Sequence, residues 1–138
     1  MLYEIVPNRV YLSNFPDAMR EVKRDMFVFN CTADLPMVGV GIRLAVNDDL
    51  KPESIQKMTS ALPMVVPYID KYKRVLVHCA AGQQRSATVV AGYLMYKYNY
   101  TVDQAIQYVK SKKPDAFLGG VHFENSLKDY YGYLHKNG

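Results

Sequence analysis

Cysteine is scarce in this chain: only Cys31 and Cys79 occur among its 138 residues. Two cysteines allow at most one disulfide, which excludes a small secreted domain held together by several bridges. So few thiols, with no bridge framework, are typical of proteins from a reducing compartment. We therefore expect a cytoplasmic location, and the sequence leaves open whether the protein also enters the nucleus.

Long apolar runs and lipidation signals are also missing. No stretch approaches the roughly 18 consecutive apolar residues of a membrane span, and the chain does not start with a basic segment followed by an apolar one. Leu2 in place of glycine excludes N-myristoylation, and residues 136–138 contain no cysteine for prenylation. We expect a soluble protein with no membrane partner.

Charge of one sign is not concentrated in any segment. The 17 basic and 13 acidic residues give a net charge of +4, and no run of Lys or Arg is longer than a pair. This balance mildly favours anionic partners but argues against a nucleic-acid partner. Apolar residues make up 49% of the chain, which excludes a disordered protein.

One domain, 1–138, is expected, because no repeat, linker or low-complexity tract divides the sequence. A domain of this length buries about two thirds of its unfolded surface, so a real core can form. Two of the predicted strands contain runs, 27–29 and 75–77, that are apolar on both faces. Strands of a parallel sheet covered by helices on both sides have this pattern. The predicted strands are 10–12, 26–30, 42–46 and 75–78.

Helical spacing of apolar residues dominates the second half of the chain. Apolar residues in 102–109 recur at i, i+3, i+4 and i+7, and Thr101 with Gln104 predicts a capping box at the start of this helix. Further helices are predicted over 87–98 and 123–134. Strands alternating with helices predict an α/β fold, with a central, mostly parallel sheet of about four or five strands flanked by helices.

The segment 52–73 is helical in pattern but contains two internal prolines. Pro63 and Pro67 each remove a backbone donor, which costs about 3 kcal/mol in a helix interior. We expect this helix to be kinked or split near residues 61–66.

The most informative segment follows the predicted strand 75–78. Small and polar residues stand between this strand and the next helix, and a loop wrapped around a point would bring its N–H groups together with the positive end of that helix. Gly82 supplies the positive φ that such a wrap needs, and Arg85 can grip two phosphate oxygens in a bidentate fork. The predicted phosphate-binding residues are Ala80, Ala81, Gly82, Gln83, Gln84 and Arg85.

Cys79 lies at the base of this predicted anion site. The helix N-terminus, the oriented amides and the guanidinium all favour its thiolate, so we predict a nucleophile. The alternative is a small core residue at a strand end. The combination of His78 before the cysteine with Gly82, Arg85 and Ser86 after it favours the nucleophile. We expect no metal and no other cofactor.

The pattern His-Cys-x5-Arg-Ser at 78–86 resembles the signature of cysteine-dependent protein phosphatases. The short chain is similar to the atypical dual-specificity group, which includes the poxvirus-type enzymes. Matches at 10–13, 29–32, 46–48 and 93–95 extend the resemblance over nearly the whole chain. The resemblance implies a protein-tyrosine-phosphatase-like fold with a shallow cleft. It also implies hydrolysis of phosphotyrosine and phosphoserine or phosphothreonine in phosphoproteins through a cysteinyl-phosphate intermediate.

The same resemblance assigns a role to each residue of the motif. Cys79 attacks phosphorus, while Arg85 and the loop amides hold the equatorial oxygens. Ser86 donates a hydrogen bond to the sulfur and helps it leave, although serine suits a helix N-cap equally well and the two roles are compatible. His78 orients the loop from behind as a neutral core histidine and is not a proton donor.

The general acid of the resembled family is an aspartate on a loop after the third strand. Asp48 and Asp49 are both candidates here, and the register of Val46-Asn47-Asp48 favours Asp48. Asp49 is then the stand-in, or a negative charge at the N-terminus of the next helix.

Cys31 is predicted to lie at the end of a strand beside the one that ends at Cys79. Neighbouring strand ends are about 5 Å apart, a separation that a disulfide tolerates. A reversible Cys31–Cys79 bond under peroxide would protect the reactive thiolate, whereas the alternative is a buried structural cysteine.

Other substrate classes remain as alternatives. The loop lacks the lysine of phosphoinositide phosphatases and the Thr-His residues of the RNA 5′-triphosphatase branch, which counts against both. A non-catalytic phosphate-binding pseudophosphatase is a third alternative, but the intact set of Cys79, Arg85, Ser86 and Asp48 argues against it. The physiological substrate and the oligomeric state are not predicted.

Overall fold

The computed structural model describes residues 1–136, and at its centre lies a mixed five-stranded sheet of order β1-β2-β5-β3-β4. Only β1 is antiparallel to its neighbour, so the expected mostly parallel sheet is confirmed. The carboxyl ends of the parallel strands therefore meet at one edge. Of the expected domain 1–138, residues 137–138 lie outside the described part. The strands are β1 (Tyr3–Val6), β2 (Val10–Ser13), β3 (Met26–Asn30), β4 (Gly41–Arg43) and β5 (Arg74–His78).

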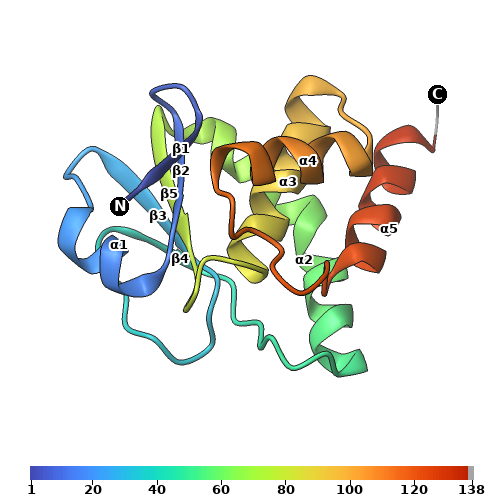
Figure 1. Ribbon diagram of the computed structural model, residues 1–138, viewed down its shortest axis with the longest axis horizontal. Helices are drawn as coiled ribbons and strands as arrows, with labels where there is room; N and C mark the ends of the chain where they lie inside the picture. Colours follow the sequence, from blue (N-terminus) through green and yellow to red (C-terminus); the bar gives the residue numbers. More distant parts are fainter. Residues whose placement is uncertain (137–138) are drawn as a thin grey trace.

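Helices cover both faces of the sheet, with α1 on one side and four larger helices on the other (Figure 1). The alternation of β5 explains the two layers: Val75 and Val77 pack into the large cluster under α2–α5, and Leu76 packs against α1. In residues 1–136 no helix combines the length and apolarity needed to cross a bilayer. The helices are α1 (Phe15–Glu21), α2 (Pro52–Tyr68), the 3-10 turn η1 (Ile69–Lys71), α3 (Arg85–Tyr98), α4 (Val102–Lys112) and α5 (Glu124–His135).

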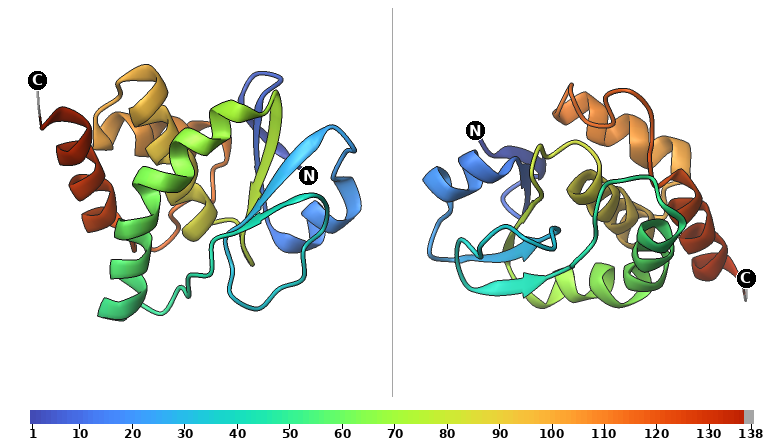
Figure 2. Two further views of the ribbon diagram at one scale, coloured as in Figure 1. Left: turned by 180° about the vertical axis from the view of Figure 1, so that it is seen from behind. Right: turned by 90° about the horizontal axis from the view of Figure 1, so that it is seen from below.

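The proline-containing helix α2 bends along its length but is one continuous element (Figure 2). The expected kink is therefore present and the alternative, a split, is wrong. Met58, Leu62 and Val66 are fully buried on one face of α2, on either side of Pro63. Their shared burial against the core holds the two halves together, although a proline removes a helical hydrogen bond.

Two boundaries differ from the sequence prediction. The strand expected over 42–46 ends at Arg43, because Val46 N donates to Leu44 O at 2.9 Å and turns the chain away from β3. The edge strand β1 and the short helix α1 are not among the predicted elements. The capping box of Thr101 and Gln104 at the start of α4 is confirmed.

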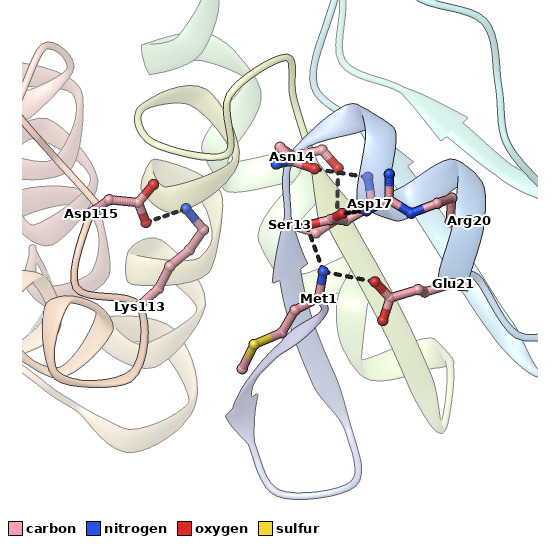
Figure 3. A network of polar contacts seen from close by, with 8 residues as sticks. All are labelled: Met1, Ser13, Asn14, Asp17, Arg20, Glu21, Lys113 and Asp115. Carbon is pink, nitrogen blue, oxygen red and sulfur yellow. Dashed lines mark hydrogen bonds and ion pairs between the residues drawn. The ribbon is translucent and has the colours of Figure 1, made fainter.

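Helix α1 starts directly after β2 and is fixed at its first turn. Asn14 caps it, with Oδ1 accepting a hydrogen bond from Asp17 N at 2.8 Å. The terminal amine of Met1 lies 2.5 Å from the Asp17 carboxylate and 2.7 Å from that of Glu21 (Figure 3). These contacts hold the connection between β2 and α1, which borders the candidate site.

Candidate active site

Cys79 follows the carboxyl end of β5 and opens into a cleft of about 250 Å³. Its side chain is buried, with 2% exposed. The cleft therefore brings together the predicted nucleophile, most of the predicted loop, the predicted arginine and Asp48. Its lining residues are Asp48, Cys79, Ala80, Ala81, Gln83, Gln84, Arg85, Leu118 and His122.

A larger groove of about 680 Å³ lies between the segment after β4 and the start of α2. It shares Val46 with the surroundings of Arg85 but holds neither the cysteine nor the loop after β5. The smaller cleft is the candidate active site because it contains the predicted nucleophile and most of the predicted anion loop, which the larger groove lacks.

The loop after β5 is shaped by a glycine with positive φ. Gly82 has a φ of 70°, and a Cβ atom there would lie 2.7 Å from the carbonyl C and O of Ser13 and 2.8 Å from Asn14 N. Phe15 N also donates to Ala80 O at 3.0 Å. The loop thus rests directly on the backbone between β2 and α1, where no side chain fits at Gly82.

Ser86 contacts the sulfur, as the resemblance implies: its Oγ lies 3.1 Å from Cys79 Sγ. The N-cap interpretation of Ser86 is wrong, because α3 begins at Arg85 with Gln84 as its N-cap. The hydroxyl is fully buried and thus held beside the thiol.

His78 is fully buried at the end of β5, behind the loop. Its Nδ1 lies 3.3 Å from Cys79 O, and its ring centroid lies 5.9 Å from that of Phe15. Burial lowers the pKa of His78, which favours the neutral imidazole. The placement fits the expected support of the loop.

Arg85 joins the loop to the segment that carries the aspartate. One terminal nitrogen donates to Val46 O at 2.9 Å, and the buried Nε has no hydrogen-bond partner among the residues that the structure describes. A buried guanidinium N–H without a partner is costly unless a ligand accepts its hydrogen bond. Beside the loop amides, a phosphate oxygen is the acceptor that this donor fits.

The structure separates the two candidate acids. The Asp48 carboxylate lines the cleft, and the cleft lining does not include Asp49. Asp49 Oδ1 instead accepts a hydrogen bond from Lys51 N at 3.0 Å, just before α2. Hydrogen bonds from Ser54 and from the Lys51 backbone lower the pKa of Asp49, so it stays ionised at the helix start.

Sequence reasoning named neither of the two residues that close the cleft on the far side. His122 Nδ1 lies 2.7 Å from Asp48 Oδ1, and Leu118 also lines the cleft. Both residues stand between α4 and α5, far from the motif in sequence. Spacing along the chain carries no signal for such a contact, because it depends on how α4 and α5 pack.

Gln83 and Gln84 have a second function that their place in the loop did not predict. Gln84 Nε2 donates to Gly120 O at 2.8 Å and to Leu118 O at 3.2 Å, and Gln83 Nε2 donates to Asp115 at 3.2 Å. Figure 3 shows Asp115 paired with Lys113, in the segment after α4. The side chains of the loop therefore fasten the segment between α4 and α5.

Cys31 lies beside Cys79, as predicted from the strand order. Its N donates to His78 O at 2.8 Å, continuing the β3–β5 pairing by one residue. Both cysteines are free and buried. Burial raises the pKa of Cys31 well above its usual range, and the nearby charge of Cys79 raises it further.

A mostly parallel sheet with a cysteine and an anion loop between its strand β5 and helix α3 defines the class of cysteine-dependent phosphatase domains. The family model described as the dual specificity phosphatase catalytic domain matches residues 10–132, and the chain belongs to this family.

Relatives agree with this assignment, and solved structures share the fold. Protein 123R of Invertebrate iridescent virus 6, a predicted tyrosine phosphatase, is 32% identical over 83% of this chain and 81% of its own length. Human dual specificity protein phosphatase 16 is 35% identical over 66% of the chain. The Yvh1 phosphatase domain from Chaetomium thermophilum has the same fold, with a TM-score of 0.80 and 21% identity over 96% of both chains.

Several relatives are much longer proteins. The matched region makes up 15% of human dual specificity protein phosphatase 16 and 28% of dual specificity protein phosphatase 1 of Arabidopsis thaliana, which is 53% identical over 55 residues. The crystal structure of human DUSP28, at 22% identity and a TM-score of 0.73, matches 96% of this chain and 94% of its own.

Gly82→Ala is expected to weaken the binding of an oxyanion such as tungstate by at least about tenfold, or about 1.4 kcal/mol. The added Cβ would meet the Ser13 backbone, so the loop must move and its amides no longer converge. Isothermal titration calorimetry measures the affinity. Gly119→Ala is the control. Gly119 also has a positive φ, of 83°, but a Cβ atom added there would have no neighbour within 4 Å. Equal affinities for Gly82→Ala and the wild type would contradict this account of the loop.

Proposed function

We propose that this chain hydrolyses phosphomonoesters of phosphoproteins, at phosphotyrosine and at phosphoserine or phosphothreonine. The observation that carries the proposal is the placement of Cys79 at the base of the loop, 3.1 Å from the Ser86 hydroxyl and in the same cleft as Arg85 and Asp48. A binding module would need the anion site alone, whereas this cleft also contains a nucleophile and a carboxylate. Membership of the dual specificity phosphatase family supports the same chemistry.

In the first step the Cys79 thiolate attacks phosphorus, and the bond from phosphorus to the leaving oxygen breaks. The loop amides and the guanidinium of Arg85, whose Nε–H is unpartnered among the described residues, hold the three remaining oxygens as charge shifts among them. Asp48 gives its proton to the leaving oxygen, which departs as the free hydroxyl of the protein substrate. The product is a phosphate bound to the sulfur.

In the second step water attacks the phosphorus of this intermediate. The Asp48 carboxylate takes a proton from the water, the sulfur–phosphorus bond breaks, and inorganic phosphate is released. The departing sulfur regains negative charge, which a hydrogen bond from the Ser86 hydroxyl stabilises. Both steps use groups of the chain and water, with no metal ion.

The loop side chains favour phosphoproteins over polyphosphates and phosphoinositides. Gln83 and Gln84 both donate to the segment between α4 and α5, and Ala80 and Ala81 carry no polar group. Arg85 is therefore the only cationic side chain of the loop, enough for one phosphomonoester but without a second cation for a neighbouring phosphate. This arrangement argues against the RNA 5′-triphosphatase and phosphoinositide alternatives.

Turnover of para-nitrophenyl phosphate in the presence of EDTA tests the proposed function directly. The wild-type chain is expected to stay active with EDTA, and Cys79→Ser is expected to lose activity, because a hydroxyl is not ionised in this site. Tungstate binding to Cys79→Ser serves as the control for an intact loop. A wild type that binds tungstate but does not turn over would instead support the pseudophosphatase alternative.

Asp48→Asn and Asp49→Asn form a matched pair that tests the general acid. Asp48→Asn is expected to lower kcat/KM for phenyl phosphate by about 10²-fold or more, because its phenol leaving group needs a proton. Asp49→Asn should change this value by less than about threefold, since Asp49 lies outside the cleft lining. Steady-state kinetics measure both. The opposite ranking of the two variants would assign the acid to Asp49.

We further propose that Cys31 protects Cys79 from irreversible oxidation. Peroxide converts the Cys79 thiolate to a sulfenic acid with release of hydroxide, and the Cys31 thiol then displaces water to form a disulfide. The hydrogen bond from Cys31 N to His78 O supports this proposal, because each cysteine directly follows one of the two paired strands β3 and β5. Oxidation of Cys79 removes its charge, which is one of the two causes of the raised Cys31 pKa.

Treatment with peroxide followed by dithiothreitol is expected to restore most activity of the wild-type chain but little of Cys31→Ser. Without Cys31, the sulfenic acid proceeds to the sulfinic acid, which thiols do not reduce. Mass spectrometry should detect linked Cys31 and Cys79 peptides in the oxidised wild type. Sulfinic acid at Cys79 beside an unmodified Cys31 would refute the protective role.

A further inference from the structure

A histidine outside the motif contacts the proposed general acid. His122 Nδ1 lies 2.7 Å from Asp48 Oδ1, and both side chains line the cleft above Cys79. The two residues come from different parts of the fold: Asp48 follows β4, and His122 lies just before α5. Their side chains are about equally accessible, 29% for His122 and 25% for Asp48, so the contact lies at the mouth of the cleft.

The fold holds this histidine in place from two sides. The backbone N of His122 donates to Gln84 Oε1 at 3.0 Å. The Gln84 side chain in turn donates through Nε2 to Leu118 O and Gly120 O. The next residue, Phe123, is buried in the large core cluster. Gln84 itself is 4% exposed and lies in the anion loop. His122 is thus held in a fixed position relative to the proposed phosphate-binding loop.

The backbone just before the aspartate is held by the same loop and by α2. Arg85 donates to Val46 O at 2.9 Å, two residues before Asp48, and Lys57 Nζ donates to Ala45 O at 3.1 Å. Asp48 nevertheless belongs to an irregular, exposed stretch between β4 and α2. Within residues 1–136, the side-chain contact of the carboxylate itself is with His122 Nδ1.

We propose that His122 is a positioning residue for the general acid Asp48, an inference that rests on the proposed phosphatase function. Nδ1–H donates to Oδ1 and fixes the plane of the carboxyl group, which leaves Oδ2 to carry the proton that is transferred. When the leaving oxygen takes this proton, the carboxylate that remains accepts the hydrogen bond from Nδ1–H. In the second step the same carboxylate receives a proton from the attacking water, and the pair returns to its starting state.

The consequence is a dependence on the leaving group. A poor leaving group, such as a phenol with a pKa of about 10, needs the positioned proton in the transition state. An acidic leaving group, such as para-nitrophenol, departs with little help from the acid. Loss of His122 should therefore lower kcat/KM for phenyl phosphate more than for para-nitrophenyl phosphate. The ratio kcat/KM is the appropriate measure because it reports the steps through cleavage of the phosphorus–oxygen bond.

His122→Asn and His122→Gln test this role as a matched pair. The amide nitrogen of asparagine takes the place of Nδ1, whereas that of glutamine takes the place of Nε2, so only the asparagine variant retains a donor to Oδ1. His122→Gln is expected to lower kcat/KM for phenyl phosphate about tenfold and for para-nitrophenyl phosphate by less than about twofold. His122→Asn should stay within about threefold of the wild type with both substrates. His135→Gln, on the exposed end of α5, is the control and should change neither value.

The outcomes are distinguishable from a failure of the proposed function. Equal losses with both substrates in His122→Gln, equal losses in the asparagine and glutamine variants, or no loss in either would overturn the positioning role while leaving the phosphatase activity in place. A wild-type chain that turns over neither substrate would overturn the proposed function, and the role of His122 with it. Thermal unfolding of each variant checks that its Tm matches that of the wild type.

Discussion

The close approach of Gly82 to the backbone of Ser13 and Asn14 is the constraint on which the candidate site depends. A Cβ atom has no space there, so the loop after β5 lies directly on the end of β2. Two strands that pair in the sheet thereby continue into two connections that touch each other. The N–H groups of the loop are free to face an anion because the opposite side of the loop is occupied by backbone. Arg85 and Cys79 take their places from this wrapped shape.

The loop also organises the surroundings of the anion site. Arg85 reaches the segment after β4 through Val46 O, and Gln84 reaches the segment before α5 through Leu118, Gly120 and His122. Segments far apart in the sequence are thus tied to one short loop. The proposed nucleophile, the proposed acid and the histidine beside it are therefore all positioned relative to the same loop, and catalysis by positioned groups requires such fixed geometry. Polar side chains of the loop make these attachments, which leaves the backbone N–H groups for the proposed phosphate.

Local patterns predicted the parts of the molecule that depend on local chemistry. The strands β3 and β5, apolar on both faces, and the capped helix α4 follow directly from their residues. The nucleophile and its loop were recognisable because they are contiguous in the sequence. The end of β4 was not recognisable, because it depends on a turn at Val46, whose carbonyl oxygen accepts a hydrogen bond from the distant Arg85. The choice of Asp48 over Asp49 rested on a register match, and its contact with His122 arises only from tertiary packing.

The sheet that carries the site has two short edges. β1 consists of four residues with an irregular register between Glu4 and Val6, and β4 consists of three. Unpaired strand edges are templates on which other chains can add strands, and short or irregular edges are poor templates. The protein therefore presents little backbone for extension of its sheet, even in concentrated solution. Association between copies would have to use side-chain surfaces of the helices, because the edges offer too few consecutive donors and acceptors for a shared sheet.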